Sequence, residues 1–172
     1  MKRILSLTLA ILMLVAALSG CNGDNTPAKQ LTAEERTQLY KTAIEGARDA
    51  EANEYQPVIS EANEETEFLM EVLGLSASDM DVFGLSVSMM NVKAYGIAAI
   101  YPAEGKADAV KEGLQGFIDR QKQNFEQYLA DQYEVAQNAK LETLSDGTIL
   151  MVMCEGQDEV FDAIKSAILD AQ

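Results

Sequence analysis

The chain contains no histidine and no tryptophan, and it has only three prolines and two cysteines among its 172 residues. Without histidine, Ser-His and Cys-His nucleophile pairs are impossible, as is a zinc site of the usual histidine-rich kind. Histidine is also the side chain whose unperturbed charge changes between about pH 6 and 8. Binding and stability should therefore be nearly independent of pH in that window.

Positive charge is scarce as well, since 13 Lys and Arg stand against 28 Asp and Glu, a net charge of −15. Such a field repels nucleic acid, so we expect no nucleic-acid partner. Ten acidic residues and no basic one lie between Arg48 and Lys93. No EF-hand or comparable ligand spacing occurs in this run, so we interpret it as solvated helix faces and predict no metal site and no cofactor.

The first twenty residues have the order of a secretory signal peptide. Lys2 and Arg3 give a positive start, an apolar run follows from Ile4 to Leu18, and small residues precede Cys21. The run is shorter than the roughly 18 to 20 residues that a mature membrane-spanning helix needs. We therefore predict a cleaved signal peptide over residues 1–20.

The residues at the predicted cleavage point, Leu18-Ser19-Gly20-Cys21, resemble the lipobox of bacterial lipoproteins, in which a lipid is attached to the cysteine. Cys21 is thus the predicted lipidation site, and an ordinary signal peptide with a chance cysteine near the cut is the alternative. Loss of Lys2 and Arg3 changes the net charge to −17, so acyl chains such as palmitate would supply the membrane affinity. The expected location is the outer face of the cell membrane.

After a lipidated tether over residues 21–31, the pattern predicts one domain over residues 32–172. Thr32 to Glu35 has the form of a capping box that opens a first helix. A second helix is predicted over Glu61–Leu73, with Gly74 as its end and an inner side formed by Phe68, Leu69 and Val72.

The remaining elements are predicted in the order β-β-α-β-β-α. Residues 83–89 alternate large and small, typical of a strand with one buried face, and residues 93–101 form its hairpin partner inside the sheet. A helix over 106–128 contains Gly113 and Gly116, for which we expect close packing against the sheet. A hairpin around Gly147 and a helix over Gln157–Leu169 follow. The fold class is α+β, with a four-stranded, largely antiparallel sheet covered by helices.

These segments resemble a bacterial lipoprotein family described only as domain of unknown function 4358. The resemblance extends over about residues 33–169 and is most specific at Ser88–Val92 and Tyr128–Tyr133. It implies a surface lipoprotein and brings no established activity.

Two functions of different class follow from the residues. The first is a non-catalytic envelope module that binds a protein or cell-wall partner, with Ser86, Ser88 and Asn91 as candidate binding residues. These would lie on a bare patch if register brought the small residues of the two strands together, and packing of the first helix on that face is the alternative. The second function is a small hydrolase that uses carboxylates, or Ser86 or Ser88 with Lys93. Cys154 is predicted to be a buried apolar residue, and we expect no enzyme activity.

Overall fold

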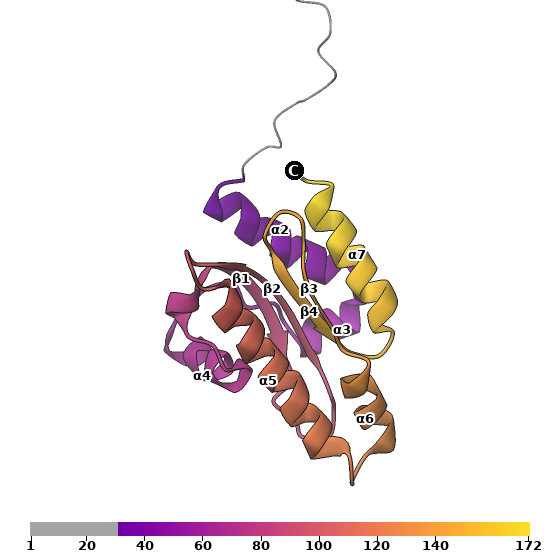
Figure 1. Ribbon diagram of the computed structural model, residues 1–172. Helices are drawn as coiled ribbons and strands as arrows, with labels where there is room; N and C mark the ends of the chain where they lie inside the picture. Colours follow the sequence, from indigo (N-terminus) through magenta and orange to yellow (C-terminus); the bar gives the residue numbers. More distant parts are fainter. Residues whose placement is uncertain (1–30) are drawn as a thin grey trace, which may run out of the picture.

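The computed structural model describes residues 31–172, so Cys21 and the predicted signal peptide lie outside the described residues. The predicted α+β class is confirmed, with helices packed on one antiparallel sheet (Figure 1). The helices are α2 (Ala33–Gly46), α3 (Ala50–Tyr55), α4 (Glu64–Leu73), α5 (Ala107–Phe125), α6 (Ala130–Gln137), α7 (Gln157–Leu169) and a short 3-10 helix, η1 (Ala77–Asp79). The strands are β1 (Met80–Val87), β2 (Gly96–Pro102), β3 (Lys140–Thr143) and β4 (Ile149–Met153).

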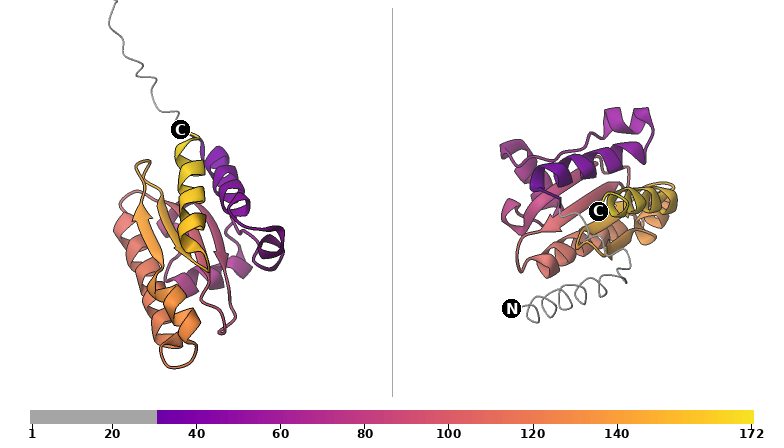
Figure 2. Two further views of the ribbon diagram at one scale, coloured as in Figure 1. Left: turned by 90° about the vertical axis from the view of Figure 1, so that its right-hand side faces the viewer. Right: turned by 90° about the horizontal axis from the view of Figure 1, so that it is seen from above.

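The strand order in the sheet is β1-β2-β4-β3, and every neighbouring pair is antiparallel. The apolar strand β2 is therefore central, as predicted, and β1 and β3 form the edges. Helices cover both faces, with α2 and α7 on one and α5 on the other, as the view from above shows (Figure 2). None of the described helices combines the length and the apolar composition needed to cross a membrane.

The capping box that opens α2 is present. The Thr32 hydroxyl accepts from the Glu35 backbone, and the Glu35 carboxylate accepts from the Thr32 backbone, at 3.2 and 2.9 Å. Two unsatisfied donors of the first turn are thus paired, which fixes where the helix begins.

The prediction that β1 has only one buried face is wrong. Gly84 and Ser86, expected on the solvent side, are both buried. Gly84 lies beneath α2, where an ideal Cβ would come within 3.1 Å of the Tyr40 Cβ, and Ser86 is hydrogen-bonded to Arg48 and Gln56. The alternation of large and small residues arises because a closely packed helix, and not water, covers the small ones. Met89 lies beyond the end of the strand and is 51% exposed.

The predicted inner side of α4 also needs correction. Phe68 is 58% exposed, whereas Met70 and Leu73 are buried in the core. The helix begins at Glu64, three residues later than predicted, and ends before Gly74, whose φ of 74° suits glycine. Apolar spacing alone does not say which of two adjacent apolar stripes meets the sheet.

The two glycines of α5 differ in their surroundings. An ideal Cβ at Gly113 would lie 2.6 Å from the Gly74 carbonyl oxygen, so α5 approaches the backbone that follows α4 and not, as predicted, the sheet. At Gly116 the nearest neighbour of such a Cβ is the flexible end of Arg120, at 3.3 Å. Only Gly113 is required by close packing.

Gly113→Ala is therefore expected to lower the free energy of unfolding by about 1–3 kcal/mol, because backbone must move to admit the methyl group. Gly116→Ala, in the same helix, should raise it by about 0.5–1 kcal/mol through helix propensity. Urea unfolding of both variants measures the two effects. Equal effects of the same sign would contradict the described contact between Gly113 and Gly74.

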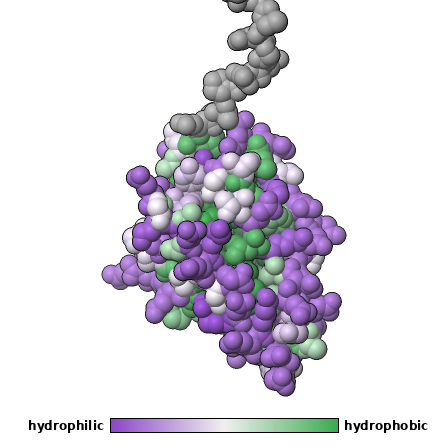
Figure 3. All heavy atoms as spheres, in the orientation of Figure 1, coloured by the Kyte–Doolittle hydropathy of each residue, from purple (hydrophilic) through white to green (hydrophobic). Residues whose placement is uncertain are grey.

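The beginning of α2 and the carboxyl end of α7 lie at the same end of the molecule, together with the β3–β4 turn (Figures 1 and 2). The loop that joins β1 to β2, residues 88–95, lies at the opposite end of the sheet. Hydrophilic residues cover most of the surface seen in Figure 3.

Candidate functional site

The three predicted binding residues lie in different surroundings. Ser86 is fully buried, Ser88 is 8% exposed, and Asn91 is exposed in the β1–β2 loop. Ser86 pairs with Ile97, so it shares a face with Ile97 and not with Gly96 or its small neighbours. Register therefore does not form the bare patch, and helix packing, the stated alternative, is found on this face.

A groove of about 690 Å³ lies beside Ser88, at the end of β1. One wall comes from α3 and residues 56–59, the other from the end of β1 and the loop that follows it. Its apolar lining consists of Tyr55, Ile59, Leu69, Val87, Met89 and Met90. Lys93 and Tyr95 add polar atoms, and Asp49 and Glu51 lie on the α3 side.

Arg48 fixes the α3 wall of this groove to the sheet. Its Nη1 donates to the Gln56 carbonyl oxygen at 2.9 Å, to the Ser86 hydroxyl at 2.8 Å and to the Tyr95 hydroxyl. Its Nη2 donates to the side chain of Asn53 in α3 at 2.6 Å. One guanidinium thus joins α3, the segment that follows it, β1 and the last residue of the β1–β2 loop.

All of these partners of Arg48 are uncharged. Within residues 31–172 no carboxylate forms an ion pair with Arg48, and its buried Nε has no hydrogen-bond partner. Lys93, at the other end of the acidic run, lies 6.0 Å from the centre of the Tyr95 ring, so the two basic residues that flank the run meet around Tyr95. Two cations without ion-pair partners therefore lie beside the groove of a strongly acidic chain.

Arg48→Lys should lower the free energy of unfolding by about 1–3 kcal/mol, because an ammonium group cannot reproduce the planar fork of four hydrogen bonds and leaves buried acceptors unpaired. Arg120→Lys is the matched control, since Arg120 is exposed and donates to a single backbone oxygen, that of Val72. Its effect should stay within about 0.5 kcal/mol. Equal urea midpoints for the two variants would contradict a clamping role of Arg48.

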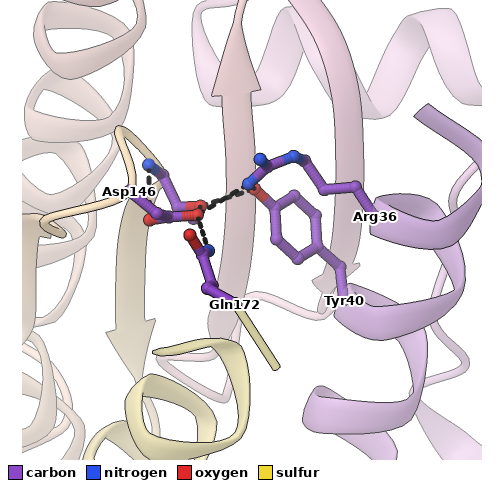
Figure 4. Close-up of polar contacts among 5 residues, drawn as sticks. Arg36, Tyr40, Asp146 and Gln172 are labelled. Atoms are coloured by element: carbon purple, nitrogen blue, oxygen red, sulfur yellow. Dashed lines mark hydrogen bonds and ion pairs between the residues drawn. The ribbon is translucent and has the colours of Figure 1, made fainter. Parts of the chain in front are cut away.

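A second polar cluster lies at the other end of the sheet (Figure 4). Arg36 of α2 forms an ion pair of 2.6 Å with Asp146 in the β3–β4 turn, and Thr148 and Gln172 also donate to this carboxylate. The Tyr40 hydroxyl is 2.6 Å from that of Thr148. The cluster is enclosed, since the Asp146 side chain is only 2% exposed, so we assign it a structural role.

Burial alone would raise the pKa of Asp146, but the hydrogen bonds from Thr148, Gln172 and Arg36 outweigh it and hold the pKa below its ordinary value. Burial raises the pKa of Tyr40 to about 12. Both groups therefore keep one charge state at neutral pH.

The model of a protein family described as Domain of unknown function (DUF4358) matches residues 58–154, more than half of the chain. The chain belongs to this family. The match is shorter than the predicted span of 33–169 and leaves α2, α3 and α7 outside. It includes the β1–β2 loop and eight of the groove residues: Ile59, Leu69, Val87, Ser88, Met89, Met90, Lys93 and Tyr95. No curated protein and no solved structure matches the chain.

Because the description of the DUF4358 family states no activity, the chemistry of the other candidate groups must be judged from their surroundings. Within the described residues, neither Ser86 nor Ser88 is hydrogen-bonded to Lys93. The prediction that Cys154 is buried is confirmed, and burial raises the pKa of its thiol to about 11, despite the opposing effect of Arg48 and Lys93. At neutral pH this thiol is protonated and a poor nucleophile.

Carboxylates line another hollow, of about 660 Å³, at the start of α7. They are Asp131, Glu134, Glu155, Asp158 and Glu159. A hydrogen bond from Gln132 lowers the pKa of Asp131, whereas a general acid needs a raised pKa. In the described part of the chain no group of three or more His, Cys, Asp or Glu side chains could hold a metal ion.

Few features of the sequence indicate the groove. The α3 helix was not predicted, and the partners of Arg48 lie up to 47 residues away in the chain. The sequence feature that relates to the groove is the single arginine in front of ten acidic residues, which distant neutral groups hold in place.

Proposed function

We propose that the chain is a lipid-anchored envelope protein that binds a protein partner in this groove and is not an enzyme. The lipobox resemblance at Cys21 supports the anchor and a location on the outer face of the cell membrane. The groove supports the binding role. A net charge of −17 after cleavage leaves the lipid as the source of membrane affinity.

One observation carries the binding role: large apolar side chains are exposed together at the groove. Six such residues are exposed in the described part of the chain, and three of them, Tyr55, Met89 and Met90, line the groove. A fourth, Val92, lies in the same loop and is 52% exposed. Clustered apolar exposure marks interaction sites, and methionine adapts its shape to a bound surface.

A photoreactive amino acid at position 90 of the full-length chain tests this role in intact cells. We expect a crosslinked protein from position 90 and none from Lys111, an exposed position on α5 that is outside the groove. Absence of a crosslink at position 90, or the same product from both positions, would overturn the binding role.

A further inference from the structure

The outer edge of β1 is paired at one point only within the described residues. Leu85 and Ile59 exchange two backbone hydrogen bonds, of 2.7 and 2.8 Å, in an isolated antiparallel bridge. Because the backbone groups of a strand alternate in direction, Val87 also points its N–H and C=O away from β2. Ser88 bonds back to Tyr95 of the sheet, which agrees with this alternation.

Continued by one more pair, the register of the Ile59–Leu85 bridge would bring residue 57 opposite Val87, and residue 57 is a proline. Proline has no N–H to give to the Val87 carbonyl. No hydrogen bond joins Val87 to this segment among the described residues. The outward N–H and C=O of Val87 therefore have no backbone partner among the described residues, and Val87 lines the groove.

The groove thus offers three features together: the unpaired backbone groups of Val87 at the edge of β1, apolar side chains on either side of them, and the cation of Lys93, which forms no ion pair within the described residues. We propose that the partner binds as an extended segment that adds a strand to β1 at Val87. Its alternate apolar side chains contact Met89, Met90 and Tyr55. A carboxylate of the segment lies near Lys93, on the side of the groove away from Asp49 and Glu51. This inference rests on the proposed function and names the form of the partner.

Charge favours this occupant over a neutral one. Lys93 is exposed, lines the groove and forms no ion pair within the described residues, and Arg48 beside Tyr95 has none either. The positive charge of Lys93 attracts a carboxylate of the partner, whereas the rest of this acidic surface repels it. The backbone bonds of an added strand supply affinity, and the apolar contacts select its side chains.

Val87→Pro tests the open edge directly, because it removes the one N–H that would donate to the added strand and leaves the ladder between β1 and β2 intact. Val87→Thr is the matched control, since it keeps the N–H and a similar shape. The probe is a displayed library of heptapeptides, selected on the full-length chain in detergent.

We expect enriched peptides with alternating apolar residues and a carboxylate, bound to the threonine variant and about tenfold more weakly to the proline variant, as loss of one hydrogen bond implies. Lys93→Gln should weaken the same peptides but not their versions with Asn or Gln in place of the acid. Equal affinity for the proline and threonine variants, or no enrichment, would overturn strand addition.

N-methylated peptides provide a test that does not depend on folding of the proline variant. Methylation of alternate amides should abolish binding for the set that faces β1 and leave it unchanged for the other set. Equal effects of both sets would overturn the proposal. If the crosslink from position 90 persists in cells that carry Val87→Pro, the groove still binds a partner and strand addition is wrong. If no crosslink forms from position 90 in the chain that keeps Val87, the proposed function itself is overturned.

Discussion

Cys21→Ala is expected to abolish the lipid label of the chain and either to release the chain from the membrane fraction or to leave it misprocessed. The lipobox resemblance implies a diacylglyceryl group on this sulfur, with a further acyl chain on the new amino terminus in some lipoproteins. Each buried methylene contributes about 0.8 kcal/mol to membrane binding, so two or three long chains would hold the protein firmly. None of the described helices offers a second means of insertion. Metabolic labelling with a fatty-acid probe, followed by fractionation of the cells, measures both effects.

The second cysteine supplies the control for this experiment. Cys154 is buried in the sheet core and holds no lipid in our proposal, so Cys154→Ala should keep both the label and the membrane location. Equal label on the unmodified chain and on the Cys21 variant would refute the lipidation site.

Asp146→Ala is expected to lower the free energy of unfolding by about 3–5 kcal/mol, because it leaves the guanidinium of Arg36 without its counter-charge in a site closed to water. The Arg36 side chain is only 10% exposed. The donors of Thr148 and Gln172 lose their acceptor in the same change. Urea unfolding at pH 7 measures the loss.

Glu142→Ala is a matched control in the same β-hairpin. Glu142 forms a 2.6 Å ion pair with Lys165, but both side chains are more than a third exposed. The pair should therefore contribute at most about 1 kcal/mol to the free energy of unfolding. Comparable losses in the two variants would contradict a special contribution from the enclosed pair.

The stabilisation by Asp146 should also depend on pH. The pKa of Asp146 is lower in the folded than in the unfolded chain, so its stabilisation is fully present above the unfolded value of about 3.9 and is lost as the pH falls through the folded value. The difference between the unmodified chain and Asp146→Ala should therefore shrink in strong acid. It should be constant between about pH 6 and 8, as the absence of histidine predicts. A sharp change within that range would contradict both arguments.

Local signals predicted much of the fold, because each acts over a few residues. The helix at Gln157–Leu169 has the bounds expected from its apolar period, and the turn at Gly147 has the positive φ that its residues favour. The two faces of β2 also agree with the alternation in its sequence, since Ile97 and Ala98 belong to the two different core clusters.

Features that depend on distant contacts were not predictable in the same way. The period of the apolar residues predicted that Phe68 and Met89 are buried. Both are exposed, Phe68 on α4 and Met89 in the loop after β1, because no described element covers them. Arg48 and its neutral partners join distant segments of the chain, and so do Arg36 and Asp146, which are 110 residues apart. No local sequence pattern indicates such pairs. The candidate site was therefore located only in part, through Ser88 in the β1–β2 loop.

The start of the described residues and the groove lie at opposite ends of the sheet, which bears on the direction in which the groove would face. The described chain starts at the end of the sheet that holds the β3–β4 turn, and the groove lies at the other end, about 20 Å away for a strand of the length of β2. A lipid on Cys21 would thus attach the protein by the end far from its binding site. A secreted or wall-bound partner would meet the groove first, whereas a partner within the same bilayer would have to extend past the whole length of the sheet to reach it.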